Sequence, residues 1–144
     1  MKDYTKLNQY LSNLAVLNIN LHNIHWNVEG LQFVKVHEFT EQLYDDFFEK
    51  FDAVAELLKM KGEKPLVKMS DYLENATIKE LDKDKFTIRE SLELVLEYLN
   101  EMKKLATEIR NEADEEGDFE VVMEFEDHVA GYSKNIWFIN AMLA

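Results

Sequence analysis

The chain has 144 residues, and its 29 acidic side chains outnumber the 16 basic ones to give a formal net charge of -13. That length suits one domain with a core of its own, so we expect a single domain over residues 1–144. The charge argues against a surface built to bind nucleic acid, because phosphate binding needs clustered Lys and Arg. The absence of cysteine excludes disulfides, iron–sulfur clusters and thiol nucleophiles.

The chain contains only 4 glycines and 1 proline, too few for the many turns of a β-sandwich or barrel. Its first ten residues are polar and amphipathic, which is unlike a secretory signal. No apolar run approaches the ~18 residues of a membrane span. These features predict a cytoplasmic protein of long helices without a membrane segment.

Apolar side chains recur at spacings of three and four over residues 2–28, which predicts an amphipathic helix that Gly30 closes. The members of this stripe are Leu7, Leu11, Leu14, Leu17, Leu21 and Ile24. A second helix is predicted over residues 36–60, with Gly62 as its C-terminal cap and Pro65 in the following connection. Its apolar face consists of Phe39, Leu43, Phe47, Phe51, Val54 and Leu58.

The third long helix is predicted to begin at Thr87, since Thr87 and Glu90 have the spacing of a capping box. Its stripe is Ile88, Leu92, Val95, Leu99, Met102, Ala106 and Ile109. After a break at residues 116–118, the stripe of the fourth helix is Val122, Phe125, Val129, Tyr132, Ile136, Ile139 and Leu143. Within the long connection between the second and third helices, residues 69–75 predict a short extra helix. The predicted fold is an all-α four-helix bundle.

An acidic stripe runs along the second predicted helix, on the face opposite its phenylalanines. At 100° per residue, Glu41, Asp45, Asp52 and Glu56 fall within roughly 60° of one another, and His37 lies about 40° to their other side. A solvated helix face is one interpretation, although such faces usually carry i,i+4 ion pairs and this one has almost no basic partner. A metal site is the other, because carboxylates and imidazoles together suit iron or manganese.

The spacing of these residues restricts where a metal could bind. The residues three positions before the four histidines are Ile19, His22, Val34 and Phe125. The Glu-x-x-His motif of ordinary di-iron bundles is therefore absent. His37 and Asp52 are about 22 Å apart along one helix and cannot share an ion within one chain. Two copies packed antiparallel would bring His37 of one beside Asp52 and Glu56 of the other, which gives two identical sites in a twofold dimer.

Several motifs together resemble one known family. They are the run Leu-His-Asn-Ile-His-Trp-Asn-Val-Glu-Gly at residues 21–30, Phe33 and His37-Glu38 after it, and residues 43–56 with Asp52-x-x-x-Glu56. Residues 72–74, 116–118 and 136–137 fit at the expected places. In this combination the chain resembles, over essentially its whole length, the ferritin-like mini-ferritins called Dps, for DNA-binding protein from starved cells.

The resemblance implies a ferroxidase whose catalytic metal ligands are His25 and His37 from one subunit and Asp52 and Glu56 from its twofold neighbour. Glu41 occupies the place of an acidic residue that supports or extends the metal site. Members of the family assemble as hollow dodecamers, oxidise iron(II) with hydrogen peroxide or oxygen, and store the ferric mineral inside. The implied metal is non-haem iron, and the implied role is protection from oxidative damage.

Other residues have more than one interpretation. Trp26, next to the metal in the family, is either a participant in redox chemistry or a core or interface aromatic. His22 is expected to pack or form hydrogen bonds rather than bind metal, and His128 is expected to be a surface histidine. The acidic cluster at residues 112–120 is either a solvated turn or the acidic pore through which family members admit iron.

The termini do not favour DNA binding. Family members that bind DNA often carry a Lys/Arg-rich tail, whereas residues 1–6 contain two lysines against one acid and residues 141–144 carry no charged side chain. The main hypothesis is therefore an iron-oxidising, iron-storing enzyme. A nucleoid-associated protein that binds and protects DNA is the alternative, and a helical interaction module without catalysis is the third possibility.

Overall fold

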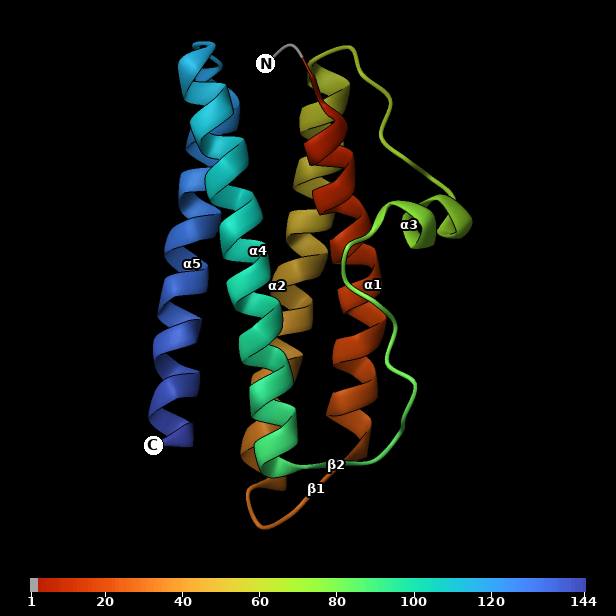
Figure 1. The fold of residues 1–144 in the computed structure, drawn as a ribbon, viewed down its shortest axis with the longest axis vertical. Helices are drawn as coiled ribbons and strands as arrows, with labels where there is room; N and C mark the ends of the chain where they lie inside the picture. Colours follow the sequence, from red (N-terminus) through yellow and green to blue (C-terminus); the bar gives the residue numbers. More distant parts are fainter. Residues whose placement is uncertain (1–2) are drawn as a thin grey trace.

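The computed structural model describes residues 3–144, most of which lie in a bundle of long helices (Figure 1). The long helices are α1 (Thr5–Asn27), α2 (Phe33–Met60), α4 (Ile88–Glu115) and α5 (Phe119–Leu143). A short helix, α3 (Met69–Asn75), lies between α2 and α4. The predicted all-α four-helix bundle with a short extra helix is confirmed. Lys2, where the first helix is predicted to begin, lies outside the described residues.

The order of the helices requires one long connection. Short turns join α1 to α2 and α4 to α5, so each of these pairs is antiparallel, whereas α2 and α4 run in the same direction (Figure 1). The segment from α2 to α4 therefore travels the length of the bundle, and α3 within it packs against α1. One side of α2, which carries residues 41, 45, 48, 52 and 56, is exposed in the described part of the chain.

The core forms where the four apolar stripes meet. Every member of the α1 stripe is buried, and the α4 stripe is buried from Leu92 to Ile109. In α2, Phe39 and Phe51 are only half-buried, and so is every second member of the α5 stripe. Each fully buried apolar side chain contributes about 1.5–3 kcal/mol, so the stripes that the periodicity reveals are also the main source of stability.

Asparagine side chains on α1 hold the crossover against the bundle. The Asn13 Oδ1 atom accepts the backbone N–H groups of Thr77 at 2.8 Å and Ile78 at 3.2 Å. Two turns further on, Asn20 accepts the N–H of Leu81 at 3.2 Å. Both asparagines are buried. They supply the hydrogen bonds that an extended segment, unlike a helix, cannot form with itself.

The turn between α1 and α2 meets the start of α4 in a two-residue parallel bridge, which the sequence does not predict. β1 (Val28–Glu29) pairs with β2 (Phe86–Thr87). Gly30 follows β1 with a φ of +144°, and a Cβ atom there would lie 2.6 Å from Cγ1 of Ile88. The helix ends at Asn27, before Gly30, so this glycine allows the turn to pass close to α4 rather than capping α1.

Local signals at the helix ends are confirmed. The Thr87 side chain accepts the N–H of Glu90 at 3.0 Å, and Glu90 accepts the N–H of Thr87 at 3.3 Å, which completes the predicted capping box. Gly62 follows α2 with a φ of +78°. The helix begins at Phe33, three residues earlier than predicted, so His37 lies within it.

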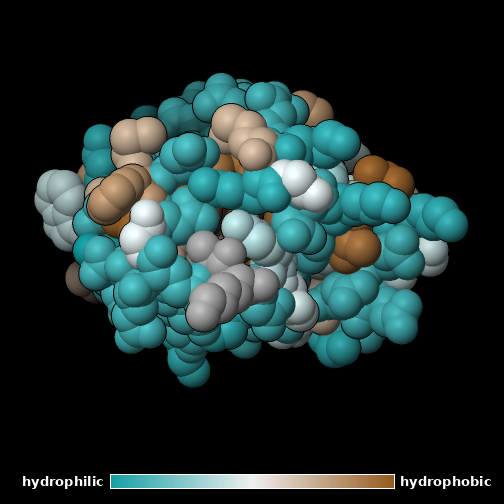
Figure 2. Space-filling model, turned by 90° about the horizontal axis from the view of Figure 1, so that it is seen from above, coloured by the Kyte–Doolittle hydropathy of each residue, from teal (hydrophilic) through white to brown (hydrophobic). Residues whose placement is uncertain are grey.

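The end of the bundle that carries the α4–α5 turn is mostly hydrophilic, with separate apolar side chains between the polar ones (Figure 2). This is what the excess of acidic residues leads us to expect. Among residues 3–144, no helix has the length and apolar character needed to cross a membrane.

Candidate metal centre

His25, near the end of α1, and His37, near the start of α2, stack face to face. Their ring centroids are 3.5 Å apart and the ring planes are inclined by 14°. Each imidazole also binds the main chain of the other residue. Nδ1 of His25 donates to the carbonyl of His37 at 2.6 Å, and Nδ1 of His37 donates to the carbonyl of His25 at 2.8 Å. These reciprocal bonds fix both rings relative to the backbone of both helices.

The same bonds determine the protonation of the two rings. A carbonyl oxygen only accepts, so each Nδ1 carries a proton, and Nε2 is the ring nitrogen that each histidine can offer to a metal ion. Burial lowers the pKa of His25, which is 4% exposed, and this favours its neutral form. The Thr40 hydroxyl, 3.1 Å from Nδ1 of His25, also orients this ring. A neutral imidazole with an anchored Nδ1–H is the form that binds metals through Nε2.

The carboxylates of the acidic stripe are exposed in the single chain. Glu41 lies one turn beyond His37 and accepts a hydrogen bond from the Tyr44 hydroxyl at 3.3 Å. Further along, the carboxyl groups of Asp52 and Glu56 meet. The pKa of Glu56 is raised because its protonated form donates a hydrogen bond to Asp52 and because Asp52 is negatively charged. Two carboxylates this close repel each other when both are ionised, and a cation between them would remove that repulsion. These residues therefore fit a metal ion.

The structure brings His25 and His37 together but keeps Asp52 and Glu56 away from them. We call the first pair the histidine half-site and the second the carboxylate half-site. They lie towards the two ends of α2, and the 15 residues from His37 to Asp52 span about 22 Å. Within the described chain, no three His, Asp or Glu side chains form a group that could hold one ion. Each half-site supplies two ligands, and neither is a complete centre.

Aromatic side chains surround the histidine half-site. His22 stacks on Tyr44 with ring centroids 3.8 Å apart, and its Nδ1 donates to the carbonyl of Asn18 at 2.6 Å. These contacts agree with the packing and hydrogen-bonding role predicted for His22. Trp26 lies beside His22, at 5.3 Å between ring centroids, and is 66% exposed. Its exposure rules out the core as its place in the single chain.

The prediction that His128 is a surface histidine is wrong, since this side chain is 1% exposed. It lies between Tyr10 and Phe125, with ring centroids 5.6 and 4.9 Å away. The acidic residues around it in the sequence suggest a surface position. Its spacing of three from Phe125 and four from Tyr132, both on the buried face, is the signal that could have placed it correctly.

Basic side chains reach into the acidic turn at residues 112–120. Lys6 of α1 pairs with Glu112. Lys61, just after α2, places its Nζ atom 2.7 Å from Oδ1 of Asp118 and 3.3 Å from Oε2 of Glu120. Part of the acidic cluster is thus neutralised within the chain, and its role as a pore stays a prediction.

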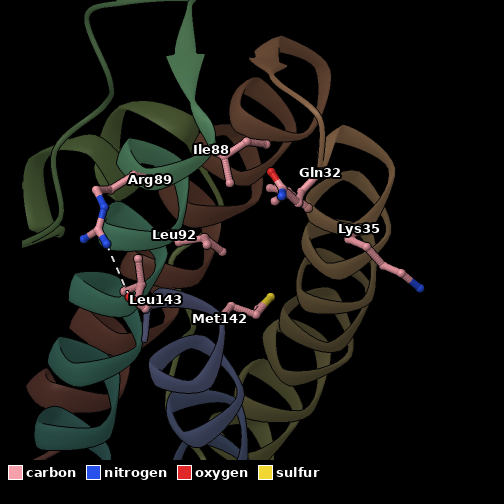
Figure 3. Close-up of a pocket in the computed structure, with 8 residues that line it drawn as sticks. Gln32, Lys35, Ile88, Arg89, Leu92, Met142 and Leu143 are labelled. Atoms are coloured by element: carbon pink, nitrogen blue, oxygen red, sulfur yellow. Dashed lines mark hydrogen bonds between the residues drawn. The ribbon is translucent and has the colours of Figure 1, made fainter.

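A cavity of about 350 Å³ opens where the beginnings of α2 and α4 meet the end of α5 (Figure 3). Leu92 and Met142 form apolar walls, and Arg89 donates from Nη2 to the carbonyl of Leu143 at 3.3 Å. The lining residues are apolar or basic apart from Gln32. Iron binding needs carboxylate or imidazole ligands, so this cavity does not suit it.

Comparison with known sequences identifies relatives of the same length. Residues 4–144 match the family described as the ferritin-like domain. A DNA protection during starvation protein of Helicobacter pylori is 35% identical over 144 residues, which cover all of both chains. A protein of the same name from Brevibacillus brevis is 32% identical, over 95% of this chain and 91% of that one.

Solved structures share the fold closely. Helicobacter cinaedi CAIP superimposes with a TM-score of 0.94 at 36% identity and covers 96% of this chain and 97% of its own. Dps from Listeria innocua, in crystals soaked with zinc, has a TM-score of 0.93 at 30% identity, over 98% and 96% of the two chains. A Dps protein from Vibrio cholerae O1, described as a ferritin-like diiron-carboxylate protein, has a TM-score of 0.92 at 29% identity, over 96% and 87%.

Proposed function

The chain belongs to the Dps family of ferritin-like proteins, and from that premise we propose that it oxidises iron(II) at centres shared between two subunits. Hydrogen peroxide or oxygen is the oxidant, and the ferric product is stored inside a hollow assembly of twelve subunits in the cytoplasm. The observation that carries this proposal is the histidine half-site, in which both Nε2 atoms are left free by the bonds of Nδ1. Iron is the substrate and cargo of this reaction.

The two half-sites complement each other in a twofold dimer. They lie on the same side of α2, so antiparallel packing of two α2 helices would set His37 of one chain beside Asp52 and Glu56 of the partner subunit. His25 would lie in the same centre, because its ring stacks on that of His37. Two imidazoles and two carboxylates match the ligand preference of iron. Glu41, one turn from His37, would extend the centre.

An apolar groove next to the carboxylate half-site supports the docking of a second copy. It has a volume of about 200 Å³ between α1, α2 and α3, and Ile19, Phe48 and Met69 contribute to its lining. These three side chains are 50%, 63% and 61% exposed in the single chain. Large apolar groups gathered at a surface are typical of an interface. Phe48 lies one turn before Asp52, so a subunit that covers the groove also encloses the carboxylate half-site.

Such a centre favours oxidation of iron in pairs. One hydrogen peroxide and two protons accept one electron from each of two iron(II) ions, which gives two iron(III) ions and two waters without releasing a hydroxyl radical. The Asp52 and Glu56 carboxylates, as hard anionic ligands, stabilise iron(III) more than iron(II) and so promote the electron transfer. The few protein ligands allow the ferric product to leave, and a net charge of -13 per chain favours the accumulation of cations in the interior.

An anaerobic iron(II) titration followed by oxidant tests the activity. Metal-free protein is loaded with iron(II) and mixed with peroxide or oxygen while the ferric absorbance is recorded. We expect saturable loading and oxidation faster than in buffer alone. Rates equal to those in buffer would contradict the proposal. Sedimentation of the same sample should show an assembly, and a single species near 17 kDa would contradict both the shell and the shared centre.

Mixing two inactive variants tests whether the centre is shared. A His25→Ala/His37→Ala chain is refolded together with an Asp52→Ala/Glu56→Ala chain. A mixed dimer then has one centre with all four ligands and one with none, whereas each parent has only incomplete centres. Fast ferroxidation should reappear in the mixture, towards half of the wild-type rate per mixed dimer. Each parent refolded alone is the control, and mixed dimers as inactive as the parents would contradict a shared centre.

Binding to DNA is the second candidate function, and the names of the relatives refer to DNA protection. Protection does not require contact with DNA, because removal of iron(II) and peroxide prevents the formation of hydroxyl radicals nearby. The acidic surface favours this indirect route.

A further inference from the structure

A hydrogen-bonded chain of buried side chains crosses the core between α1 and α5. The hydroxyl groups of Tyr10 and Tyr132 bond to each other, and Nδ1 of His128 lies 2.9 Å from the Tyr10 hydroxyl. Nε2 of His128 lies 2.9 Å from Oε1 of Glu124. Both tyrosines are fully buried, whereas Glu124 is half-buried. The chain thus leads from the core to the surface, and paired ferroxidation makes no use of it.

The outer end of this chain sets the direction of its hydrogen bonds. A Glu124 carboxylate only accepts, so Nε2 of His128 carries the ring proton and Nδ1 is the acceptor. Burial lowers the pKa of His128 to about 3, which keeps the ring neutral at physiological pH. The Tyr10 hydroxyl therefore donates to His128, and the Tyr132 hydroxyl donates to Tyr10.

This arrangement suits the loss of an electron and a proton together. Burial raises the pKa of Tyr10 well above its usual value, so Tyr10 stays protonated until it is oxidised. Removal of an electron makes the hydroxyl strongly acidic, and Nδ1 of His128 is already in place to take the proton. The bond from Nε2 to Glu124 then stabilises the charged ring.

The tyrosine pair lies behind the carboxylate half-site. Nζ of Lys50 is 5.5 Å from the ring centroid of Tyr132, and the rings of Phe47 and Tyr132 are 5.9 Å apart. Lys50 and Asp52 are two positions apart and therefore point to opposite sides of α2. The thickness of this helix, about 10 Å with its side chains, thus lies between Tyr132 and the proposed iron ligands. An electron that passes from Tyr10 to the iron would therefore cross the packed side chains of α2.

We propose that Tyr10 is a redox-active residue that supplies the second electron when hydrogen peroxide meets a centre holding a single iron(II). This inference rests on the proposed ferroxidase function. Iron(II) and Tyr10 each give one electron, the O–O bond of peroxide breaks, and two protons from solvent complete two waters. The hydroxyl proton of Tyr10 moves to Nδ1 of His128. A later iron(II) reduces the tyrosyl radical, and His128 returns the proton.

Without this second electron, peroxide and a single iron(II) would yield iron(III), hydroxide and a hydroxyl radical. We call the hydrogen-bonded group of Tyr132, Tyr10, His128 and Glu124 the tyrosine relay. The relay therefore extends protection to centres that hold only one iron(II). A purely structural hydrogen-bond network would fill the same space without suppressing the hydroxyl radical. Substitutions that remove single groups from the network distinguish the structural role from the redox role.

Freeze-quenched electron paramagnetic resonance is the direct measurement. Protein assembled from full-length chains receives one iron(II) per centre and then one equivalent of peroxide, and the tyrosyl signal is recorded alongside the ferric absorbance. We expect the signal in the wild type and its loss in Tyr10→Phe. His128→Gln keeps a hydrogen-bond acceptor that cannot take up a proton, so the signal should be lost there as well. Spin-trapped hydroxyl radical should rise in both variants.

Tyr98→Phe is the matched control. Tyr98 is also buried, but its hydroxyl bonds to the amide of Asn20, at 3.3 Å, which is no base. This variant should keep the wild-type signal. Tyr132→Phe should keep a radical with a shifted g tensor, because the phenoxyl oxygen of Tyr10 loses one donor. Signals of equal size in Tyr10→Phe and Tyr98→Phe, with both variants folded by circular dichroism, would overturn the proposal.

A second arm separates the relay from ferroxidation. Iron-free protein is oxidised by one electron with flash-generated ruthenium(III) tris-bipyridine, and the tyrosyl signal is compared between the same variants. A smaller signal in Tyr10→Phe than in Tyr98→Phe supports the relay, and equal signals overturn it. If the wild type forms no ferric product with peroxide, the proposed ferroxidase function is wrong. The iron-free measurement then still shows whether Tyr10 is redox-active.

Discussion

Hydrogen bonds from Nδ1 of His25 and His37 to main-chain carbonyls hold both imidazoles in the tautomer that a divalent cation needs. Neither bond requires a second subunit, so the histidine half-site is preorganised in the single chain. The carboxylate half-site is different. The pKa of Glu56 is raised by its hydrogen bond with Asp52 and by the charge of Asp52, and a cation bound between the two groups would offset their repulsion.

Gly30 lies in the turn that lets the two histidines meet, and its substitution by alanine should destabilise the protein. The residue has a φ of +144°, and a new Cβ would lie 2.6 Å from Ile88. Backbone strain and overpacking each cost about 1–3 kcal/mol, so we expect a loss of about 3 kcal/mol in the free energy of unfolding. Urea denaturation monitored by circular dichroism measures this loss.

Gly131→Ala is the control for that substitution. Gly131 lies within α5, and a Cβ there would meet no atom within 4 Å. Alanine is the better helix former by about 1 kcal/mol, so this variant should be slightly stabilised. Equal effects of the two substitutions would contradict the steric role of Gly30.

At the scale of elements, the crossover is the part of the fold that depends most on side-chain hydrogen bonds. Residues 61–87 contain little regular structure apart from α3, yet Asn8, Asn13, Asn20 and Asn23 of α1 all bond to their main chain. α1 therefore packs with its leucines and anchors the crossover with its asparagines. The same segment delivers Met69 and Tyr72 to the apolar groove of the proposed dimer interface.

Asn13→Ala should weaken this anchoring. The substitution leaves the N–H groups of Thr77 and Ile78 without their acceptor, and Ile78 is buried. An unpaired buried N–H costs about 1–3 kcal/mol, so we expect a loss of about 2–3 kcal/mol in urea unfolding. Hydrogen exchange at residues 77 and 78 should also become faster. Asn100→Ala, on the exposed face of α4, should change stability by less than about 0.5 kcal/mol; similar losses for both variants would rule out the anchoring role.

On the scale of the whole molecule, charge dominates what the assembly can attract. Twelve chains would carry twelve times -13, or -156, as a formal charge. Such a shell draws iron(II) towards itself and repels phosphates. The basic side chains Lys6, Lys61 and Arg110 are engaged in ion pairs with acids of the same chain, so they add little to a surface for polyanions.

The protein should therefore not bind duplex DNA appreciably at physiological salt. Binding through the release of counterions needs a net attraction to phosphate, and the formal charge of -13 per chain opposes it. A gel-shift assay with metal-free protein at about 0.15 M salt, with chelator to exclude divalent bridging, should show only free DNA. A retarded band under these conditions would contradict the prediction.

The sequence by itself determined the features that depend on near neighbours along the chain. The period of the apolar residues shows which face of each helix is buried, because a helix repeats every 3.6 residues whatever it packs against. The capping box at Thr87 and the glycine after α2 involve residues a few positions apart. The family motifs around His25, His37 and Asp52 are equally local, and for this reason fold and family were both predictable.

Only the tertiary structure decided which side chains meet across helices. The stacking of His25 on His37, the hydrogen bond between His128 and Tyr10, and the bonds from Asn13 to the crossover all depend on the rotation and height of one helix relative to another. Periodicity determines neither the rotation nor the height of a helix. It identifies the face that is buried but not the face against which it packs. The parallel bridge beside Gly30 was unpredictable for the same reason, because its two strands of two residues are defined by each other and by nothing in their own sequence.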